Sequence, residues 1–175
     1  MKPVLGLRAH HLLCAGEFRG LGYSQEFVAN FARILADLAS HPERPVRLIV
    51  DGPDAVCAVC PWLKGGACSR DEGGKKGVSH RDEIVCARLG LKPGAVISFG
   101  DLAALFRSRV PRAWRVSVCR GCSWFGSPCY GEEESARQGT EDSFTPACRD
   151  RVQTRSFSEQ RAAEYYPVFF PVHRR

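Results

Sequence analysis

The chain has 175 residues, of which 44% are hydrophobic, and its net charge is +6 at pH 7. This length and composition predict a small globular protein with its own core and exclude a disordered chain. The basic residues are scattered along the chain, so charge gives only weak support to nucleic-acid binding. No segment approaches the ~18–20 apolar residues of a membrane span, so we expect no membrane contact.

Nine cysteines are a high content for a chain of this size. An odd number without a visible export signal argues against a disulfide framework. Arg8, His10 and His11 interrupt the apolar run near the N-terminus, and Leu13 is too large for the residue before a lipoprotein cleavage site. We therefore expect a cytoplasmic protein whose thiols are reduced and free to bind metal.

In the first half of the chain, residues 9–19 are expected to form a short helix that carries His10, His11 and Cys14. Ser24 is placed to cap a longer helix. An apolar stripe at helical spacing marks the core face of that helix and consists of Phe27, Phe31, Ile34, Leu35 and Leu38. Residues 46–50 predict a strand, and the Gly-rich stretch 64–77 predicts a mobile loop with Cys68 at its base.

In the second half, Ser79 and Asp82 are spaced as a capping box for a helix that ends at Leu89 and is closed by Gly90. A short extended piece and a helix near 99–109 should follow. Beyond residue 134 a polar, charged run leads to an aromatic end. The sequence predicts a Cys/His-rich domain over 1–134 and an extension over 135–175 that packs on it or is tethered to it.

Two cysteine segments are near-copies of each other. VCAVCPWL at 56–63 matches VCRGCSWF at 118–125, and each is followed by a further cysteine, Cys68 in the first and Cys129 in the second. A two-residue gap lets the chain turn so that both sulfurs face one point, as a tetrahedral metal or an iron–sulfur cluster requires. Two copies with matching flanks indicate a protein that binds metal or a cluster.

The three Cys- and His-containing regions together offer enough ligands for two four-ligand sites. The candidate ligands are His10, His11, Cys14, Cys57, Cys60, Cys68, Cys119, Cys122 and Cys129. A single site of four thiols, with the remaining thiols structural, is the alternative. Cys86 and Cys148 fall outside the motifs and are expected to be ordinary buried or free cysteines.

The adjacent histidines lie one helical turn from Cys14, so either one can share a face with its thiol. Neighbouring residues on a helix point about 100° apart, so both should hardly bind one metal. We expect one to ligate and the other to hold a ligand or a carboxylate. His41, His80 and His173 are expected at the surface.

Thiolate-rich ligand sets fit both zinc and iron–sulfur clusters. The residues after the second cysteine of each pair are Pro61 and Ser123, where zinc ribbons usually have glycine. Trp62 and Trp124 follow directly and could shield a centre from solvent, which suits a cluster.

Several segments, in order, resemble a family of prokaryotic proteins defined by an HHLLC signature. They are LRAHHLLC at 7–14, GYSQEFVAN at 22–30, DGPDAVCAVCPWL at 51–63, LGLKPG at 89–94 and VCRGCSWF at 118–125. Members of this family are described as iron–sulfur binding, and their role is undefined. The resemblance covers about 5–130 and implies that the nine candidate ligands are its signature positions.

These observations predict an α+β fold, predominantly helical with little sheet, in a small domain cross-linked by cysteine-rich metal or cluster knuckles. The expected function is cytoplasmic binding of one or two iron–sulfur clusters, of the [4Fe–4S] type, for electron transfer, redox sensing or cluster handling with a redox or protein partner. The alternative is a Zn²⁺-stabilised module that contacts nucleic acid or an acidic protein.

A thiol enzyme that uses Cys57 and Cys60 as a redox pair, or Cys14 activated by a histidine, is a weaker alternative. A paired-carboxylate, nucleophile-elbow or dinucleotide-binding pattern does not stand out, so no catalytic constellation is assigned.

Overall fold

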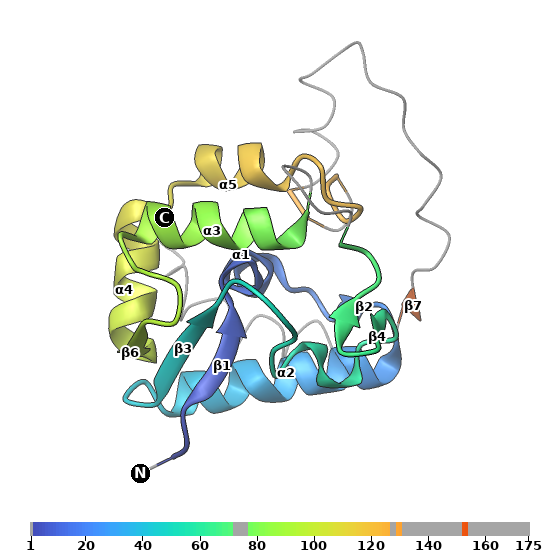
Figure 1. The fold of residues 1–175 in the computed structure, drawn as a ribbon, viewed down its shortest axis with the longest axis horizontal. Coiled ribbons are helices and arrows are strands. Elements are labelled where there is room, and N and C mark those ends of the chain that lie inside the picture. The colour runs from blue at the N-terminus through green and yellow to red at the C-terminus, as the bar shows by residue number, and fades with distance from the viewer. Residues whose placement is uncertain (1, 72–76, 127–128, 131–151, 154–175) are drawn as a thin grey trace, which may run out of the picture.

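The computed structural model describes residues 2–71, 77–126, 129–130 and 152–153 (Figure 1). Five α-helices and a short 3₁₀ helix surround a small sheet in this part of the chain. The helices are α1 (Ala9–Glu17), α2 (Gln25–Ser40), the 3₁₀ helix η1 (Cys57–Val59), α3 (Val78–Leu89), α4 (Phe99–Arg109) and α5 (Arg112–Cys119). The described fold is α+β and mainly helical, as the sequence predicts.

The main sheet has three strands in the order β1 (Leu5–Arg8), β3 (Pro45–Ile49) and β6 (Val96–Ser98). β1 runs parallel to β3, and β6 pairs antiparallel with β3 on its other side. The predicted strand at 46–50 is β3. β1 was not predicted, because its alternation of buried Leu5 and Leu7 extends over only four residues.

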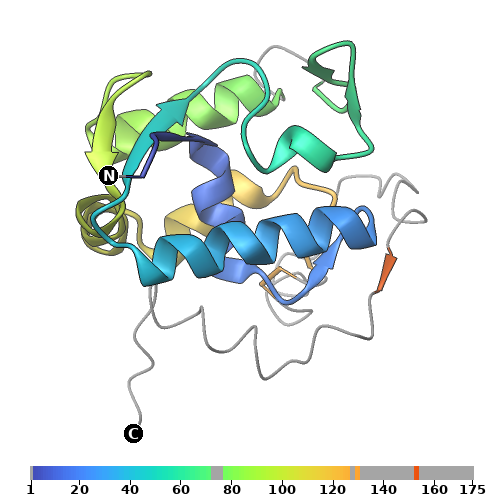
Figure 2. The ribbon, with the colours of Figure 1, turned by 90° about the horizontal axis from the view of Figure 1, so that it is seen from below.

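α1 is the central helix of the molecule. It follows β1 directly and lies between α2 and α3 in both views (Figures 1 and 2). Leu12 and Leu13 are almost completely buried, and so are most other residues of the helix. The Cys/His-containing segment is therefore held inside the protein and does not lie on its surface.

α2 forms as its sequence predicts. The Ser24 hydroxyl accepts a hydrogen bond from the Phe27 amide at 3.1 Å, which caps the helix. All five residues of the predicted apolar stripe are buried in the core. The spacing of these residues therefore fixes which face of α2 packs against the rest of the protein.

The loop prediction for 64–77 was wrong at its start. β4 (Leu63–Lys64) and β5 (Ala67–Cys68) form an antiparallel hairpin in which Leu63 pairs with Cys68. Gly65 and Gly66 have φ values of 56° and 80°, and two such residues make the tight turn that suits the twist of a hairpin. Residues 72–76 lie outside the described residues.

The capping box predicted at Ser79 and Asp82 was also wrong. α3 begins after Gly77, and both side chains point to α1 and β1, where they contact Arg8. The other end is as predicted: Gly90 adopts a left-handed conformation and closes the helix.

Most of the predicted extension at 135–175 lies outside the described residues, as do Cys148 and His173. Its described part is β7 (Val152–Gln153), which pairs antiparallel with β2 (Leu21–Gly22). Within the described residues, no helix is long and apolar enough to cross a membrane.

Candidate metal centre

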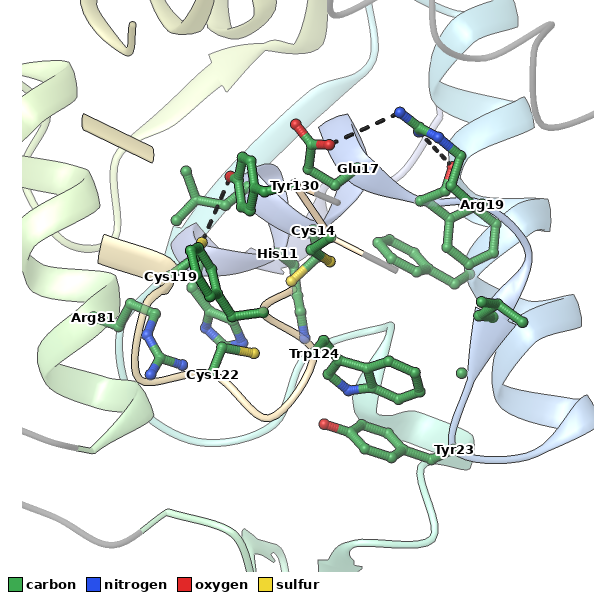
Figure 3. A pocket seen from close by; sticks show the side chains of 18 of the residues that line it. His11, Cys14, Glu17, Arg19, Tyr23, Arg81, Cys119, Cys122, Trp124 and Tyr130 are labelled. Atoms are coloured by element: carbon green, nitrogen blue, oxygen red, sulfur yellow. Dashed lines mark hydrogen bonds and ion pairs between the residues drawn. The ribbon is translucent and has the colours of Figure 1, made fainter. Parts of the chain in front are cut away.

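Four thiols line one cavity beside α1. The cavity has a volume of about 140 Å³, roughly ten times what one water molecule needs. Its cysteines are Cys14, Cys119, Cys122 and Cys129. The chain thus brings the cysteine of the HHLLC segment together with all three of the second cysteine segment, residues 119–129. Figure 3 shows Cys14, Cys119 and Cys122 at this cavity.

The backbone of the second cysteine segment places its three thiols on one side of the cavity. α5 ends at Cys119, whose carbonyl accepts a hydrogen bond from the Cys122 amide at 2.8 Å. The Cys122 carbonyl in turn accepts a hydrogen bond from the Phe125 amide at 2.9 Å, and Phe125 forms an isolated β-bridge with Cys129. Two successive turns therefore fold the segment back on itself and bring Cys129 beside the first pair.

Cys14 reaches the same cavity from the middle of α1. Burial raises the pKa of Cys14 well above its usual value, and the charges of Cys122, Cys119 and Cys129 act in the same direction. Cys14 thus lines the cavity together with three thiols that lie more than 100 residues away along the chain. The guanidinium of Arg81, which also lines the cavity, favours the thiolates of Cys14 and Cys119.

The four thiols are spread more widely than the shell of a single ion. Tetrahedral zinc with Zn–S bonds of about 2.3 Å holds its sulfurs about 3.8 Å apart. Among the described residues, the set of three ligand atoms within 4.8 Å of one another belongs to His11, Asp54 and Cys57, and the four cavity thiols form no such set. Four thiols on one cavity are a donor set that zinc or an iron–sulfur cluster can use.

Burial raises the pKa of Cys119 and Cys129 as well as that of Cys14. Burial raises the pKa of Cys119 to about 11, against a favourable effect of the Tyr130 hydroxyl, which lies 3.7 Å from its sulfur. Burial and the neighbouring Cys122 and Cys119 raise the pKa of Cys129 to about 12. Such thiols are poor nucleophiles, so the arrangement gives no support to a thiol enzyme at this cavity.

Aromatic side chains form part of the wall of the cavity. Tyr23 and Trp124 both line it, with ring centres 5.1 Å apart in an edge-to-face contact (Figure 3). Tyr23 also meets Trp62 edge-on at 6.3 Å, and the Arg70 guanidinium covers the Trp62 ring at 4.8 Å. The tryptophans of the two cysteine segments therefore meet at Tyr23, but Trp124 alone of the two lines the cavity.

Both histidines of the HHLLC segment line the cavity as well. Their ring centres lie only 4.2 Å apart, with an angle of 49° between the planes. Both rings thus lie beside one cavity, and whether both bind one metal, which their positions as neighbours on a helix argue against, stays a prediction. His10 lies in the first turn of α1, and hydrogen bonds to two carboxylates turn the rings toward the same space.

The carboxylate that holds His10 is Asp82 on α3, whose side chain is fully buried. One carboxylate oxygen accepts from the backbone amide and from the Nδ1 of His10, each at 2.7 Å. The other oxygen accepts from Arg8, with Nε at 2.7 Å and Nη2 at 2.6 Å. Burial and the nearby His11 lower the pKa of His10 to about 4, so its ring is neutral at pH 7.

The carboxylate that holds His11 is Asp54, in the turn before the first cysteine segment, residues 57–68. One of its oxygens accepts from His11 Nδ1 and from the Arg8 amide at 2.7 Å each. The other accepts from the amides of Val56 and Cys57 at 2.9 Å each. Burial would raise the pKa of Asp54, but the charge of His11 and these hydrogen bonds outweigh it and hold the pKa well below its usual range.

His11, Asp54 and Cys57 form a candidate metal triad by distance. The Asp54 carboxylate, however, already accepts four hydrogen bonds, and its 2.7 Å contact with His11 is a normal hydrogen-bond length. Burial, with a smaller contribution from Asp54, raises the pKa of the Cys57 thiol to about 12. We therefore interpret this triad as the support that orients His11.

The first cysteine segment repeats the backbone turns of the second. The Cys60 amide donates to the Cys57 carbonyl at 2.9 Å, and the Leu63 amide donates to the Cys60 carbonyl at 3.0 Å. Burial raises the pKa of Cys60, and the nearby Cys68 adds to this. Cys57, Cys60 and Cys68 do not line the thiol cavity. The structure thus separates the predicted ligands into two groups.

Asp54 and Asp82 were missed as functional residues in the sequence. Asp54 stands in a DGPD stretch that predicts only a turn, and Asp82 stands where a capping box is expected. A buried carboxylate that supports a histidine is 43 or 72 residues distant from it here, so no local spacing signals it. His41 and His80 are exposed as predicted, and Cys86 is buried in the core.

The fold and cavity define a small α+β protein with a thiol- and imidazole-lined site. The chain belongs to the family described as "Protein of unknown function (DUF1284)", whose model matches residues 22–128. The match includes the first cysteine segment and two cysteines of the second, but not His10, His11, Cys14 or Cys129. Neither a curated protein nor a solved structure shows a significant match to the chain.

Proposed function

We propose that the protein binds an iron–sulfur cluster in the thiol cavity. The four ligands are the thiols of Cys14, Cys119, Cys122 and Cys129. The observation that carries the proposal is the convergence of these thiols, from two segments more than 100 residues apart, on one cavity larger than a single ion needs. Four cysteine thiolates are the ligand set of [2Fe–2S] and [4Fe–4S] clusters, and the cavity volume favours the larger.

The surroundings of the cavity suit such a centre. Arg81 offsets part of the negative charge that four thiolates bring, and the Tyr130 hydroxyl lies within weak hydrogen-bond reach of the Cys119 sulfur. Trp124 and Tyr23 limit the access of solvent to the cavity. Charge, hydrogen bonds to sulfur and solvent exclusion are the features that set the reduction potential of a cluster.

The resemblance of residues 7–14 to the HHLLC signature supports the same assignment. A bound cluster would supply one-electron chemistry, so electron transfer, redox sensing or cluster handling are the roles that we propose. These roles fit a cytoplasmic protein, where thiols stay reduced until they bind metal. The first cysteine segment, with Cys57, Cys60 and Cys68, offers three further thiols and is the candidate for a second centre or for Zn²⁺.

Purification without oxygen tests the proposal directly. We expect a brown protein with iron and sulfide in near-equal amounts, about four of each per chain for one [4Fe–4S] centre. Cys14→Ala should lose at least nine-tenths of both, whereas Cys86→Ala, which removes a buried cysteine outside the cavity, should keep them. A colourless protein with one or two zinc ions and no sulfide would replace the cluster by the zinc-stabilised module.

A further inference from the structure

The thiol cavity holds more metal-binding groups than one cluster uses. Four thiols complete a cluster of the proposed type, and two imidazoles, His10 and His11, line the same cavity beside them. Their ring centres are 4.2 Å apart, so the two rings act as a pair. Figure 3 shows His11 within the group of side chains that includes Cys14, Cys122 and Trp124.

Each ring is oriented by a carboxylate that has no capacity left for another role. Asp82 accepts four hydrogen bonds or ion-pair contacts from Arg8 and His10. Asp54 accepts four from His11 and from three backbone amides. Because an ionised carboxylate accepts only, each Nδ1 carries the proton that it donates. Nε2 is then the nitrogen of each ring that is left to act as a metal ligand, and binding there requires the neutral form of the ring.

This arrangement matches that of metal-binding histidines, which almost always donate their other ring nitrogen to a carboxylate or carbonyl. A zinc–nitrogen bond of about 2.0–2.1 Å places the centres of two imidazoles that share a tetrahedral ion about 5 Å apart. The observed 4.2 Å is about 1 Å shorter, so a small rotation of the rings suffices to share an ion. A single such pair is a common structural feature, whereas here two adjacent pairs line one cavity.

We propose that the Nε2 atoms of His10 and His11 bind one divalent transition-metal ion, separate from the cluster and beside it. Imidazole nitrogen selects ions of the borderline class, such as Zn²⁺, Ni²⁺ or Fe²⁺. The ion leaves coordination positions that open to the cavity, so a small molecule with an oxygen or nitrogen donor can bind to it next to the cluster. The site does not depend on the cluster for its own ligands.

Zinc uptake by the anaerobically reconstituted protein tests the inference. The protein, with the substitutions Cys60→Ala and Cys68→Ala so that the first cysteine segment cannot hold zinc and with its iron and sulfide measured, is dialysed against Zn²⁺, and bound zinc is quantified and examined by X-ray absorption at the zinc edge. We expect one zinc ion per chain, with about two imidazole nitrogens near 2.0–2.1 Å and no sulfur shell near 2.3 Å. A sulfur-dominated shell, or no zinc uptake by this protein, overturns the inference.

Variants separate this site from the cluster. In the same background, His10→Gln and His11→Gln together should weaken zinc binding at least tenfold and leave iron and sulfide unchanged, since the Gln amide can still donate to the carboxylates. His80→Gln, an exposed histidine on α3, is the matched control. Loss of iron together with zinc means that the histidines are cluster ligands, and unchanged zinc binding also overturns the inference. If the wild-type protein holds no iron or sulfide, the proposed function fails, and the nitrogen shell of zinc still decides the present inference.

Discussion

The two cysteine segments have the same local structure and different surroundings. In both, the amide of the second cysteine donates to the carbonyl of the first, and the residue three positions further on donates to the second. That residue also pairs with the third cysteine, antiparallel in a hairpin for Leu63 and Cys68 and as an isolated parallel bridge for Phe125 and Cys129. The turn that a Cys-x-x-Cys pair makes is therefore set by the short-range sequence.

What differs is the part of the protein that each segment faces. The second segment faces α1 and gains Cys14 as a fourth thiol. In the first segment, Cys57 lies beside the buried Asp54, Cys60 ends η1, and Cys68 belongs to a hairpin whose other residues are exposed or half-buried. Local repetition thus predicts two thiol clusters, and tertiary structure decides which of them is completed.

Replacing one thiol in each segment should give the largest contrast. We expect Cys122→Ala to remove at least nine-tenths of the bound iron and sulfide, because a four-thiol centre loses a ligand. Cys60→Ala should leave the centre of the thiol cavity intact, since Cys60 does not line it. Iron and sulfide per chain after anaerobic purification provide the measurement. Equal losses in both variants would mean that the two segments share one centre.

The buried carboxylate of Asp82, which holds His10, should contribute strongly to the free energy of unfolding. Asp82→Ala leaves the Arg8 guanidinium in the interior without its carboxylate, and breaking a buried ion pair typically costs about 3–5 kcal/mol. Urea denaturation of the metal-free protein measures the loss in the free energy of unfolding. Asp101→Ala, at an exposed position on α4, is the control and should cost about 1 kcal/mol or less through its helix N-terminus.

Asp54→Ala should differ from Asp82→Ala in which backbone amides lose their protection from hydrogen exchange. Asp54 bonds the amides of Val56 and Cys57, so its loss should release the first cysteine segment as well as His11. Hydrogen exchange of these two amides should accelerate in Asp54→Ala and stay near the wild-type rate in Asp82→Ala. Acceleration to the same degree in both variants would show that the segment depends on the whole network and not on Asp54.

The thiol pKa values predict how the metal-free protein responds to pH. Burial raises the pKa of Cys119 to about 11 and of Cys57 and Cys129 to about 12, from the usual 9.0. Because these pKa values are higher in the folded protein than in the unfolded chain, folding favours the protonated thiols. Their contribution to the free energy of unfolding is complete below about pH 9 and is lost between pH 9 and 12. At pH 8.5, their alkylation by iodoacetamide should be about 100-fold slower than in the urea-unfolded protein.

Peptide mapping of the alkylated cysteines provides the measurement for each residue. Rates at Cys119 and Cys129 that match the unfolded protein at pH 8.5 would contradict the burial of these thiols. Metal binding must displace the protons, so the affinity of the metal-free protein for Zn²⁺ should rise with pH over the same range.

The parts of the fold that the sequence predicts are those with a local cause. The stripe of α2 repeats every three or four residues, Ser24 caps the helix beside it, and Gly90 closes α3, so each was visible in a short window. β1 offered only four residues of alternation and became a strand through its pairing with β3. The hairpin at Gly65-Gly66 could not be distinguished from a loop in the sequence, because glycines indicate a turn but not whether strands flank it.

The candidate site was predictable in composition and not in grouping. All of the cysteines and histidines that line the cavity were candidates from their spacing, since that spacing is a local property. Their assignment to one cavity depends on how α1 packs between α2 and α3, which no spacing contains. The same holds for Asp82, whose contact with His10 spans 72 residues.

The two tryptophans provide the smallest and most selective test of the comparison. Trp62 and Trp124 occupy equivalent positions in the two segments and both touch Tyr23, but Trp124 lines the thiol cavity and Trp62 does not. Since the apolar shell around a centre controls solvent access, Trp124→Leu should increase the rate at which air bleaches the visible absorbance by about three- to tenfold. Trp62→Leu should change it less than twofold, because it removes a contact of Tyr23 and not a wall of the cavity. Equal acceleration in both variants would indicate that Tyr23 transmits the loss of either tryptophan, and the two segments would then protect one centre jointly.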